Sequence, residues 1–317
     1  MSAVLVKANS VRQKGLTLVE LMVALAISLL IVIAAASFFL NSSKTRETQE
    51  AVSLLQDNAR YATEILTKSI EQTGYQNYAW GSSGASVRRE VAAPSDGEPD
   101  IRGYNNSAAG TSLNNGTHNS ATNRVNNSDT LVIRYQGSGV APGDGSMIDC
   151  RGEPQAESSS LNARAYSIFE IRRDSATSEP ELRCKYYNTT TSLFSAEKIV
   201  RGVETFQVMY GVDTDGDSYI DRWLNAAEVN PGGDTTALVD WAKVKSVRIG
   251  MVLRSPTRVT DAVPSALTLS PLGVNFTSGA TDRLVGVTTT PVEGEYSSTD
   301  GRLRKVVTFT VNVRNPL

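Results

Sequence analysis

The stretch from Arg12 to Leu40, RQKGLTLVELMVALAISLLIVIAAASFFL, decides the fold of this 317-residue chain. Its basic residues come first, and a single carboxylate, Glu20, then lies at the start of a long apolar run. From Leu21 to Leu40 the only polar residues are two serines. Twenty such residues in a helix rise roughly 30 Å, about the thickness of a bilayer core. The stretch therefore predicts a membrane-spanning helix, with Glu20 placed where an unpaired charge is costly.

A cleaved secretory signal is the alternative for this stretch. The apolar run is longer than the usual signal core of about 7–15 residues, and the helical pattern continues past Leu40. The basic residues Lys7, Arg12 and Lys14 precede the run. Their position predicts a cytoplasmic N-terminus and an exported remainder.

An amphipathic pattern follows the apolar run. Apolar residues recur at spacings of three and four, and charged residues fill the opposite face. The apolar positions are Ala51, Leu54, Leu55, Ala62, Ile65, Leu66 and Ile70. Gly74 is a natural stop for such a helix. We expect one helix from about Thr17 to Thr73, whose second half packs on a folded domain.

Charge and composition exclude several classes of function. The formal net charge is -2, and the first fifteen residues contribute three positive charges, so no basic domain points to nucleic acid. The only histidine is His118, in a stretch rich in Asn, Gly and Ser, and no Ser/His/Asp or Cys/His arrangement is assembled around it. We therefore expect no enzyme and no required cofactor.

The soluble part is expected to be rich in β-structure. Residues 74–128 read as a long surface loop, and residues 129–317 as a β-rich domain. Period-two alternation predicts strands at Asp129–Tyr135, Ala165–Arg173, Glu181–Tyr187, Ile199–Val212, Val244–Ser255 and Leu303–Arg314. A Ser/Thr/Pro-rich excursion, Pro256–Asp300, separates the last two. The predicted class is α+β: a long N-terminal helix packed on one antiparallel sheet.

The N-terminal residues carry a resemblance. The sequence KGLTLVELMVALAISLL resembles the class III signal of type IV prepilins and of type II secretion pseudopilins. The resemblance implies a leader, residues 1–15, removed by a membrane peptidase between Gly15 and Leu16. It also implies N-methylation of Leu16, although Phe or Met is commoner there. The mature helix then has a transmembrane half, residues 16–40, and an amphipathic half, residues 41–73.

The resemblance also gives Glu20 a role, as the fifth mature residue. In a filament of stacked helices, the cationic N-terminus of one subunit can meet Glu20 of its neighbour, since a carboxylate in hydrocarbon needs an opposite charge. The pairing would set axial register, while apolar faces supply most of the attraction. The alternative is a Glu20 that stays protonated or reaches the interface without a partner.

The C-terminal part of the sequence indicates which family of pilins the chain resembles. GVETFQVMYGVDTDGDSYIDRW, VKSVRIGMVLRS and RLRKVVTFTVNVRN resemble the PilW family of type IV pilus minor pilins. The implied fold is type IV pilin-like. The implied role is that of a structural subunit of the inner membrane that primes pilus assembly and can remain at the fibre tip of pili used in processes such as cell motility. The implied partners are other minor pilins, the major pilin, the inner-membrane assembly platform and the prepilin peptidase.

Two other functions stay open. A J-type pseudopilin of a type II secretion system has the same kind of N-terminus, and the aspartate-rich loop and terminal strand favour the pilin. A pilus-tip adhesin would use the Asn-rich loop or the excursion after Pro256, but neither resembles an aromatic pocket.

The two cysteines, Cys150 and Cys184, lie in the exported part, where thiols oxidise. We expect a disulfide between them that pins the preceding loop to the strand containing Cys184. Two cysteines and one remote histidine make a poor zinc site.

The loop VDTDGDSYIDRW has a spacing typical of oxygen-ligand metal sites. Asp213, Asp215, Asp217 and Asp221 fall at positions 1, 3, 5 and 9, as in an EF-hand loop. Gly216 and the residue at position 12 depart from that pattern, so a further ligand would come from Glu228 or Asp234. The pattern predicts either a Ca²⁺ site or a solvated acidic turn.

Overall fold

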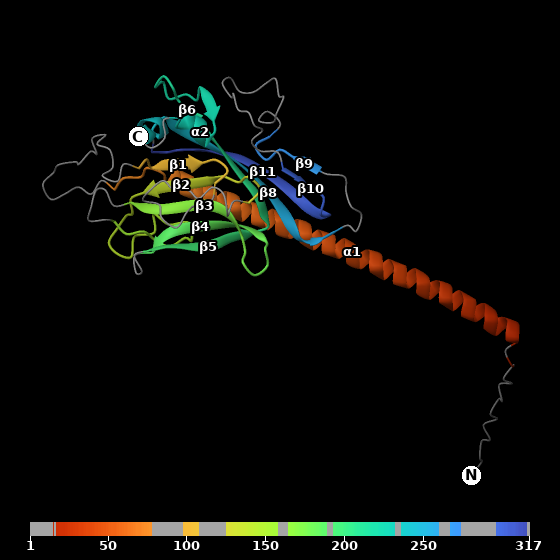
Figure 1. The fold of residues 1–317 in the computed structure, drawn as a ribbon. Coiled ribbons are helices and arrows are strands. Elements are labelled where there is room, and N and C mark those ends of the chain that lie inside the picture. Colours follow the sequence, from red (N-terminus) through yellow and green to blue (C-terminus); the bar gives the residue numbers. More distant parts are fainter. Residues whose placement is uncertain are drawn as a thin grey trace, which may run out of the picture. The chain divides into compact units, whose positions relative to one another are not determined.

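The computed structural model describes residues 15, 17–77, 98–107, 125–157, 164–188, 193–231, 236–259, 267–273 and 296–315. The chain divides into two compact units, Met1–Glu50 and Ala51–Leu317. One helix, α1 (Leu18–Glu71), contributes to both (Figure 1). Its bounds agree with the predicted helix, and Gly74 follows with φ of 69°, a left-handed conformation that suits glycine after a helix end.

The second half of α1 lies in the larger unit and buries one stripe of side chains. Ala62, Leu66 and Ile70 are fully buried, and Leu55 and Ala59 are nearly so. These positions repeat every three or four residues, so they form one helix face. The stripe packs into a single core cluster to which two β-sheets also contribute. The helix is therefore a structural part of the larger unit.

In the described residues the strands form two large antiparallel sheets and one small one, instead of the single sheet that the sequence predicts. The five-stranded sheet has the order β1-β2-β3-β4-β5, and the four-stranded sheet the order β11-β8-β6-β7 (Figure 1). The first sheet consists of β1 (Ile101–Tyr104), β2 (Thr130–Tyr135), β3 (Ala165–Arg173), β4 (Pro180–Asn188) and β5 (Leu193–Arg201). The second consists of β6 (Val203–Val212), β7 (Arg222–Leu224), β8 (Val244–Arg258) and β11 (Arg302–Asn312). The predicted α+β class, with a long N-terminal helix on antiparallel β-structure, is confirmed.

Three details differ from the sequence prediction. The predicted strand Ile199–Val212 is two strands, because Gly202 turns the chain with φ of 78° between β5 and β6. The predicted loop 74–128 contains β1, which is too short for a periodic signal. The excursion Pro256–Asp300 contains β9 (Leu267–Leu269) and β10 (Tyr296–Ser298), and two short helices, α2 (Ala226–Val229) and α3 (Ala237–Trp241), follow β7.

A buried carboxylate joins the two large sheets. Asp129, just before β2, accepts hydrogen bonds from the backbone N–H groups of Asn106 and Val208, at 3.0 and 2.8 Å. Its own N–H donates to the Phe206 carbonyl at 2.8 Å. These bonds satisfy backbone groups of β6 on the side away from β8. Backbone groups along part of one edge of the four-stranded sheet are therefore paired with Asp129, which lies next to β2 of the five-stranded sheet.

A buried ion-pair network fixes the start of β11. The Glu204 side chain is only 2% exposed and lies between two arginines. Arg304 donates to both of its oxygens, at 2.7 and 3.1 Å, and Arg254 donates at 3.1 Å. Arg254 also pairs with Glu179, in the turn between β3 and β4. Burial alone would lower the pKa of Arg304, but its hydrogen bonds to Glu204 and Asp300 raise it. The network thus connects β6, β8 and β11 to the other large sheet.

Replacing Glu204 by Ala should remove the most buried carboxylate from between Arg254 and Arg304, whose side chains are 14% and 4% exposed. We expect the free energy of unfolding to fall by about 3–5 kcal/mol, as for other broken buried ion pairs. Denaturant unfolding followed by circular dichroism measures the change. Glu64→Ala is the matched control, because the Glu64–Lys68 pair is exposed and its loss should cost less than about 1 kcal/mol. Equal losses in the two variants would contradict the role given to the network.

Candidate functional site

The N-terminal end of α1 is a capping box, formed by Thr17 and Glu20. The Thr17 N–H and hydroxyl donate to Oε2 of Glu20, at 3.0 and 3.1 Å. The Glu20 N–H donates back to the Thr17 hydroxyl at 3.3 Å. A Thr followed three residues later by a Glu is the sequence signal for this arrangement. Our sequence reasoning used Glu20 as an assembly charge and overlooked its local role.

The capping box leaves half of the Glu20 carboxylate available. Both bonds from Thr17 go to Oε2, and no described residue bonds to Oε1. An ionised carboxylate offers about four acceptor positions on its two oxygens. The capping box also holds the carboxylate at the helix end, beside Thr17. Glu20 can therefore complete its own helix and accept a second donor from outside the chain.

The predicted cleavage site lies immediately before this cap. Gly15 is exposed, and a Cβ built on it would meet no atom within 4 Å. A Cβ at this position would therefore not clash with the described part of the chain. Leu16, the predicted site of N-methylation, lies outside the described residues.

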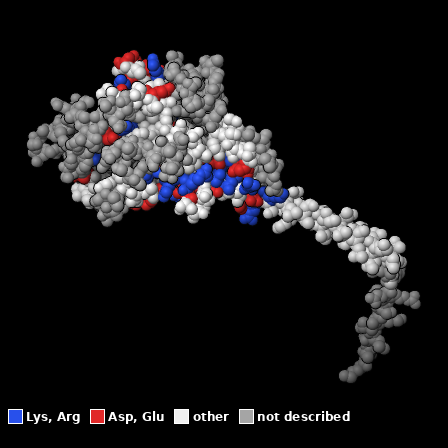
Figure 2. Space-filling model, viewed as in Figure 1, with Lys and Arg blue, Asp and Glu red and all other residues white. Residues whose placement is uncertain are grey.

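The apolar part of α1 is exposed along its whole length. The helix is long and apolar enough to cross a membrane, and none of its most apolar stretch is buried. The face seen in Figure 2 shows no charged atoms along the apolar stretch. The hydroxyls of Ser28 and Ser37 donate to the carbonyls of Leu25 and Ile33, both at 2.9 Å. Because these hydroxyls are bonded within the helix, they present little cost in hydrocarbon.

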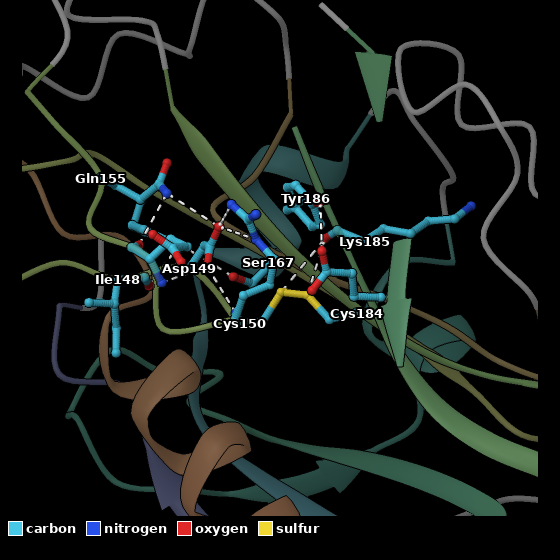
Figure 3. The surroundings of a disulfide bond; sticks show 12 residues. Ile148, Asp149, Cys150, Gln155, Ser167, Cys184, Lys185 and Tyr186 are labelled. Carbon is cyan, nitrogen blue, oxygen red and sulfur yellow. Dashed lines mark hydrogen bonds and ion pairs between the residues drawn. A yellow bond between two sulfur atoms is a disulfide. The ribbon is translucent and has the colours of Figure 1, made fainter. Parts of the chain in front are cut away.

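The structure joins Cys150 and Cys184 in a disulfide (Figure 3). Their Cα atoms are 6.2 Å apart, within the usual range for a disulfide, and both residues are buried. Cys184 lies in β4, and Cys150 in the connection between β2 and β3. The same connection reaches α1, because the Ile148 N–H donates to Oε1 of Gln72 at 2.8 Å. The bridge therefore fixes a loop that contacts both a sheet and the helix end.

Asp149 organises this loop from within. Its carboxylate accepts backbone N–H groups of Arg151 and Glu153, at 2.9 and 3.1 Å, and the Arg151 guanidinium at 2.6 Å. That guanidinium also lies 3.6 Å from the ring centroid of Tyr186, on β4. Figure 3 shows the Asp149 side chain beside the disulfide. Local bonds thus hold the loop in shape, and the disulfide attaches it to the sheet.

The aspartate loop connects β6 to β7 and brings three of its four carboxylates together. Carboxylate oxygens of Asp213, Asp215 and Asp221 lie within 4.8 Å of one another. Asp213 is buried and accepts backbone N–H groups from Gly216 and Ser218, at 2.6 and 2.9 Å. Asp221 accepts the Thr214 hydroxyl and N–H, and these bonds lower the pKa of its carboxyl. Hard cations prefer such oxygen ligands.

The loop departs from the predicted ligand set at two positions. Asp217 does not join the cluster; its Oδ1 accepts the Tyr219 N–H at 2.8 Å. Glu228 closes a capping box with Asn225 at the start of α2, so it serves that helix. Asp234 lies outside the described residues, as does His118. The residues that the structure brings together are therefore Asp213, Asp215 and Asp221.

Comparisons with known proteins give two family matches. Residues 168–315, just under half of the chain, match the family described as type IV pilus-assembly protein W. Residues 11–36 match the prokaryotic N-terminal methylation motif. A solved structure of a type IV-like pilin from Thermus thermophilus has a TM-score of 0.39 at 15% identity, covering 82% of this chain and 96% of that chain. The comparison with curated proteins gives no match.

The two family matches confirm the resemblance inferred from the sequence. The methylation motif contains Gly15 and Glu20, and the PilW match contains the aspartate loop, β8 and β11. The N-terminus of the chain is thus similar to that of prepilins, and its C-terminal part is similar to the type IV pilus-assembly protein W family. Its apolar helix is consistent with a membrane-anchored pilin.

The disulfide closes a loop with a sequence separation of 34 residues. In the chain-entropy model, its loss should lower the free energy of unfolding by about 3–4 kcal/mol. We expect the double variant Cys150→Ser, Cys184→Ser to show this loss in denaturant unfolding. Mass spectrometry of the unreduced exported protein should identify one peptide pair linked through Cys150 and Cys184. Two thiols that alkylate in the folded protein would contradict the prediction.

Proposed function

We propose that this chain is a minor pilin that helps to prime the assembly of type IV pili and can stay at the pilus tip. It acts as a structural subunit, not as an enzyme. The observation that supports the proposal is that Thr17 bonds to Oε2 of Glu20, while no described residue bonds to Oε1, which could accept a donor from another subunit. The PilW match and the methylation motif support it.

The proposed mechanism follows from the charge on the processed N-terminus. Cleavage after Gly15 converts the Leu16 amide into an ammonium group. In hydrocarbon this ammonium and a Glu20 carboxylate attract each other strongly, because little solvent screens them. The ammonium of one subunit would bind Oε1 of Glu20 in the next, while Oε2 keeps the cap. The partners are other minor pilins, the major pilin and the inner-membrane assembly platform, and the folded domain lies in the periplasm.

Two variants separate processing from assembly. Gly15→Val should leave an unprocessed precursor in the membrane, since the peptidase must accommodate the residue before the cut. Glu20→Ala should be cleaved normally but should no longer co-purify with other pilins. Immunoblots of membranes score the first outcome, and affinity purification of the tagged full chain scores the second.

Thr17→Ala is the matched control for Glu20→Ala. It removes the hydroxyl from the cap, which costs the helix about 1 kcal/mol, but it keeps the assembly carboxylate. We expect Thr17→Ala to be cleaved and to co-purify with other pilins. If Glu20→Ala co-purifies as well as the wild type does, the proposed pairing is wrong.

Deleting the gene distinguishes a type IV pilus from a type II secretion system. We expect fewer surface pili and normal secretion of type II substrates. The reverse pattern would assign the chain to the J-type pseudopilins.

We also propose that the aspartate loop binds Ca²⁺ through Asp213, Asp215 and Asp221. Three carboxylates held so close repel one another, and the ion pair between Asp213 and Lys245, whose charged atoms lie 4.0 Å apart, neutralises only one of them. Millimolar Ca²⁺ should therefore raise the melting temperature of the chelator-treated protein. Asp221→Ala should abolish the rise, and Asp217→Ala, outside the cluster, should keep it. A melting temperature that Ca²⁺ does not change would leave the loop as an acidic turn.

A further inference from the structure

A small cavity lies in the larger unit, next to the end of α1. Its volume is about 20 Å³. Its walls include Thr73, just after α1, Asp100, just before β1, and Trp241, the last residue of α3. Apolar residues of the core form much of the remaining lining: Ile101, Val244 and Val313. The cavity thus lies where three segments meet that are far apart in the sequence.

Two buried polar groups of the cavity residues have no hydrogen-bond partner among the described residues. They are the hydroxyl of Thr73 and the indole Nε1–H of Trp241. Thr73 is 1% exposed and Trp241 is 2% exposed, so bulk water does not reach them. The ring of Trp241 is held in place by Tyr210, with an edge-on contact and ring centroids 4.8 Å apart. Burial without a partner is unfavourable, and most such groups in folded proteins bond to protein or to an internal water.

The Asp100 carboxylate is the third polar group in the cavity walls. Its Oδ1 accepts a hydrogen bond from the Arg164 guanidinium at 2.6 Å. Its Oδ2 lies beside the end of α1, since a Cβ built on Gly74 would be 3.7 Å from this oxygen. A carboxylate offers about four acceptor positions on its two oxygens. Asp100 can therefore accept a further donor and keep its ion pair with Arg164.

We propose that this cavity binds one water molecule, which accepts the Trp241 Nε1–H, donates to Asp100 and bonds to the Thr73 hydroxyl. The volume suits a single water, because a space of about 10–15 Å³ is enough for one. Internal waters typically make about three hydrogen bonds, and the walls offer three polar groups. The water joins the end of α1 to α3 and to the segment before β1. The site goes beyond the proposed function, because it lies within one subunit.

The chemistry of the three groups excludes other occupants of this size. A cation is disfavoured because an indole N–H donates and cannot accept or coordinate. An anion is disfavoured because the Asp100 carboxylate would repel it. An apolar occupant would leave Thr73 and Trp241 without partners. Water both donates and accepts, so it matches all three groups.

A crystal structure of the full-length chain in detergent tests the proposal directly. We expect one ordered water within about 2.7–3.2 Å of both Trp241 Nε1 and Thr73 Oγ1. A cavity without ordered water, or a water bonded to only one of these two atoms, would overturn the inference.

The stability of Thr73→Val is a second test, because valine keeps the shape of threonine and lacks the hydroxyl. If the hydroxyl bonds to a water, the folded variant loses a hydrogen bond, and the equilibrium constant for unfolding should rise about fivefold. If the hydroxyl has no partner, its removal relieves a buried polar group, and the constant should stay the same or fall. Denaturant unfolding of the full-length chain measures the constant.

Thr63→Val is the matched control. The Thr63 hydroxyl donates to the Ala59 carbonyl at 2.8 Å within α1, and Thr63 does not line the cavity. Its loss should change the unfolding constant by less than about twofold. A constant for Thr73→Val no higher than that for Thr63→Val would contradict the water site. Neither test involves another pilin, so either result leaves the proposed function standing.

Discussion

The larger unit depends on the burial of one stripe of α1. Ala62, Leu66 and Ile70 are fully buried, and both large sheets contribute side chains to the same core cluster. The apolar side chains of α1 and of the two sheets thus shield one another from water in one core. The helix whose first half is long and apolar enough to cross a membrane thus also contributes its second half to the core of the larger unit.

Several tertiary contacts converge on the end of that helix. Gln72 accepts the N–H of Ile148, in the loop that the disulfide holds. Arg314 pairs with Glu71, and the Asn315 side chain donates to the Thr73 carbonyl. A Cβ at Gly74 would come within 2.6 Å of the Asn315 carbonyl oxygen, so the close approach of the chain's C-terminal part needs a glycine there. The disulfide loop and the segment after β11 therefore both position the helix end.

Sequence patterns predicted the features that depend on local periodicity. The bounds of α1, the α+β class and most long strands follow from the spacing of apolar residues. The patterns could not separate β5 from β6, because Gly202 interrupts an otherwise uniform β-prone run. Nor could the patterns show that the strands form two sheets, since the division depends on contacts between residues far apart in sequence, such as that between Asp129 and Val208.

The candidate site, like the fold, was predictable from the sequence only in part. The methylation-motif match includes Gly15 and Glu20, whereas loop spacing could not exclude Asp217, because it does not determine which carboxylates turn toward one another.

The two halves of α1 differ in what covers their apolar side chains. The second half satisfies its apolar stripe within the larger unit, whereas every described residue of the apolar half is exposed. Exposed apolar surface of this extent needs lipid or other helices around it. Lipid can cover the apolar side chains, but it offers no fixed cation to the free oxygen of Glu20. In the proposed assembly a neighbouring subunit would offer both, because its helix would be apolar and its processed N-terminus charged. The carboxylate would then make the protein environment more favourable than the lipid one, which would give the helix a physical reason to leave the bilayer for a filament.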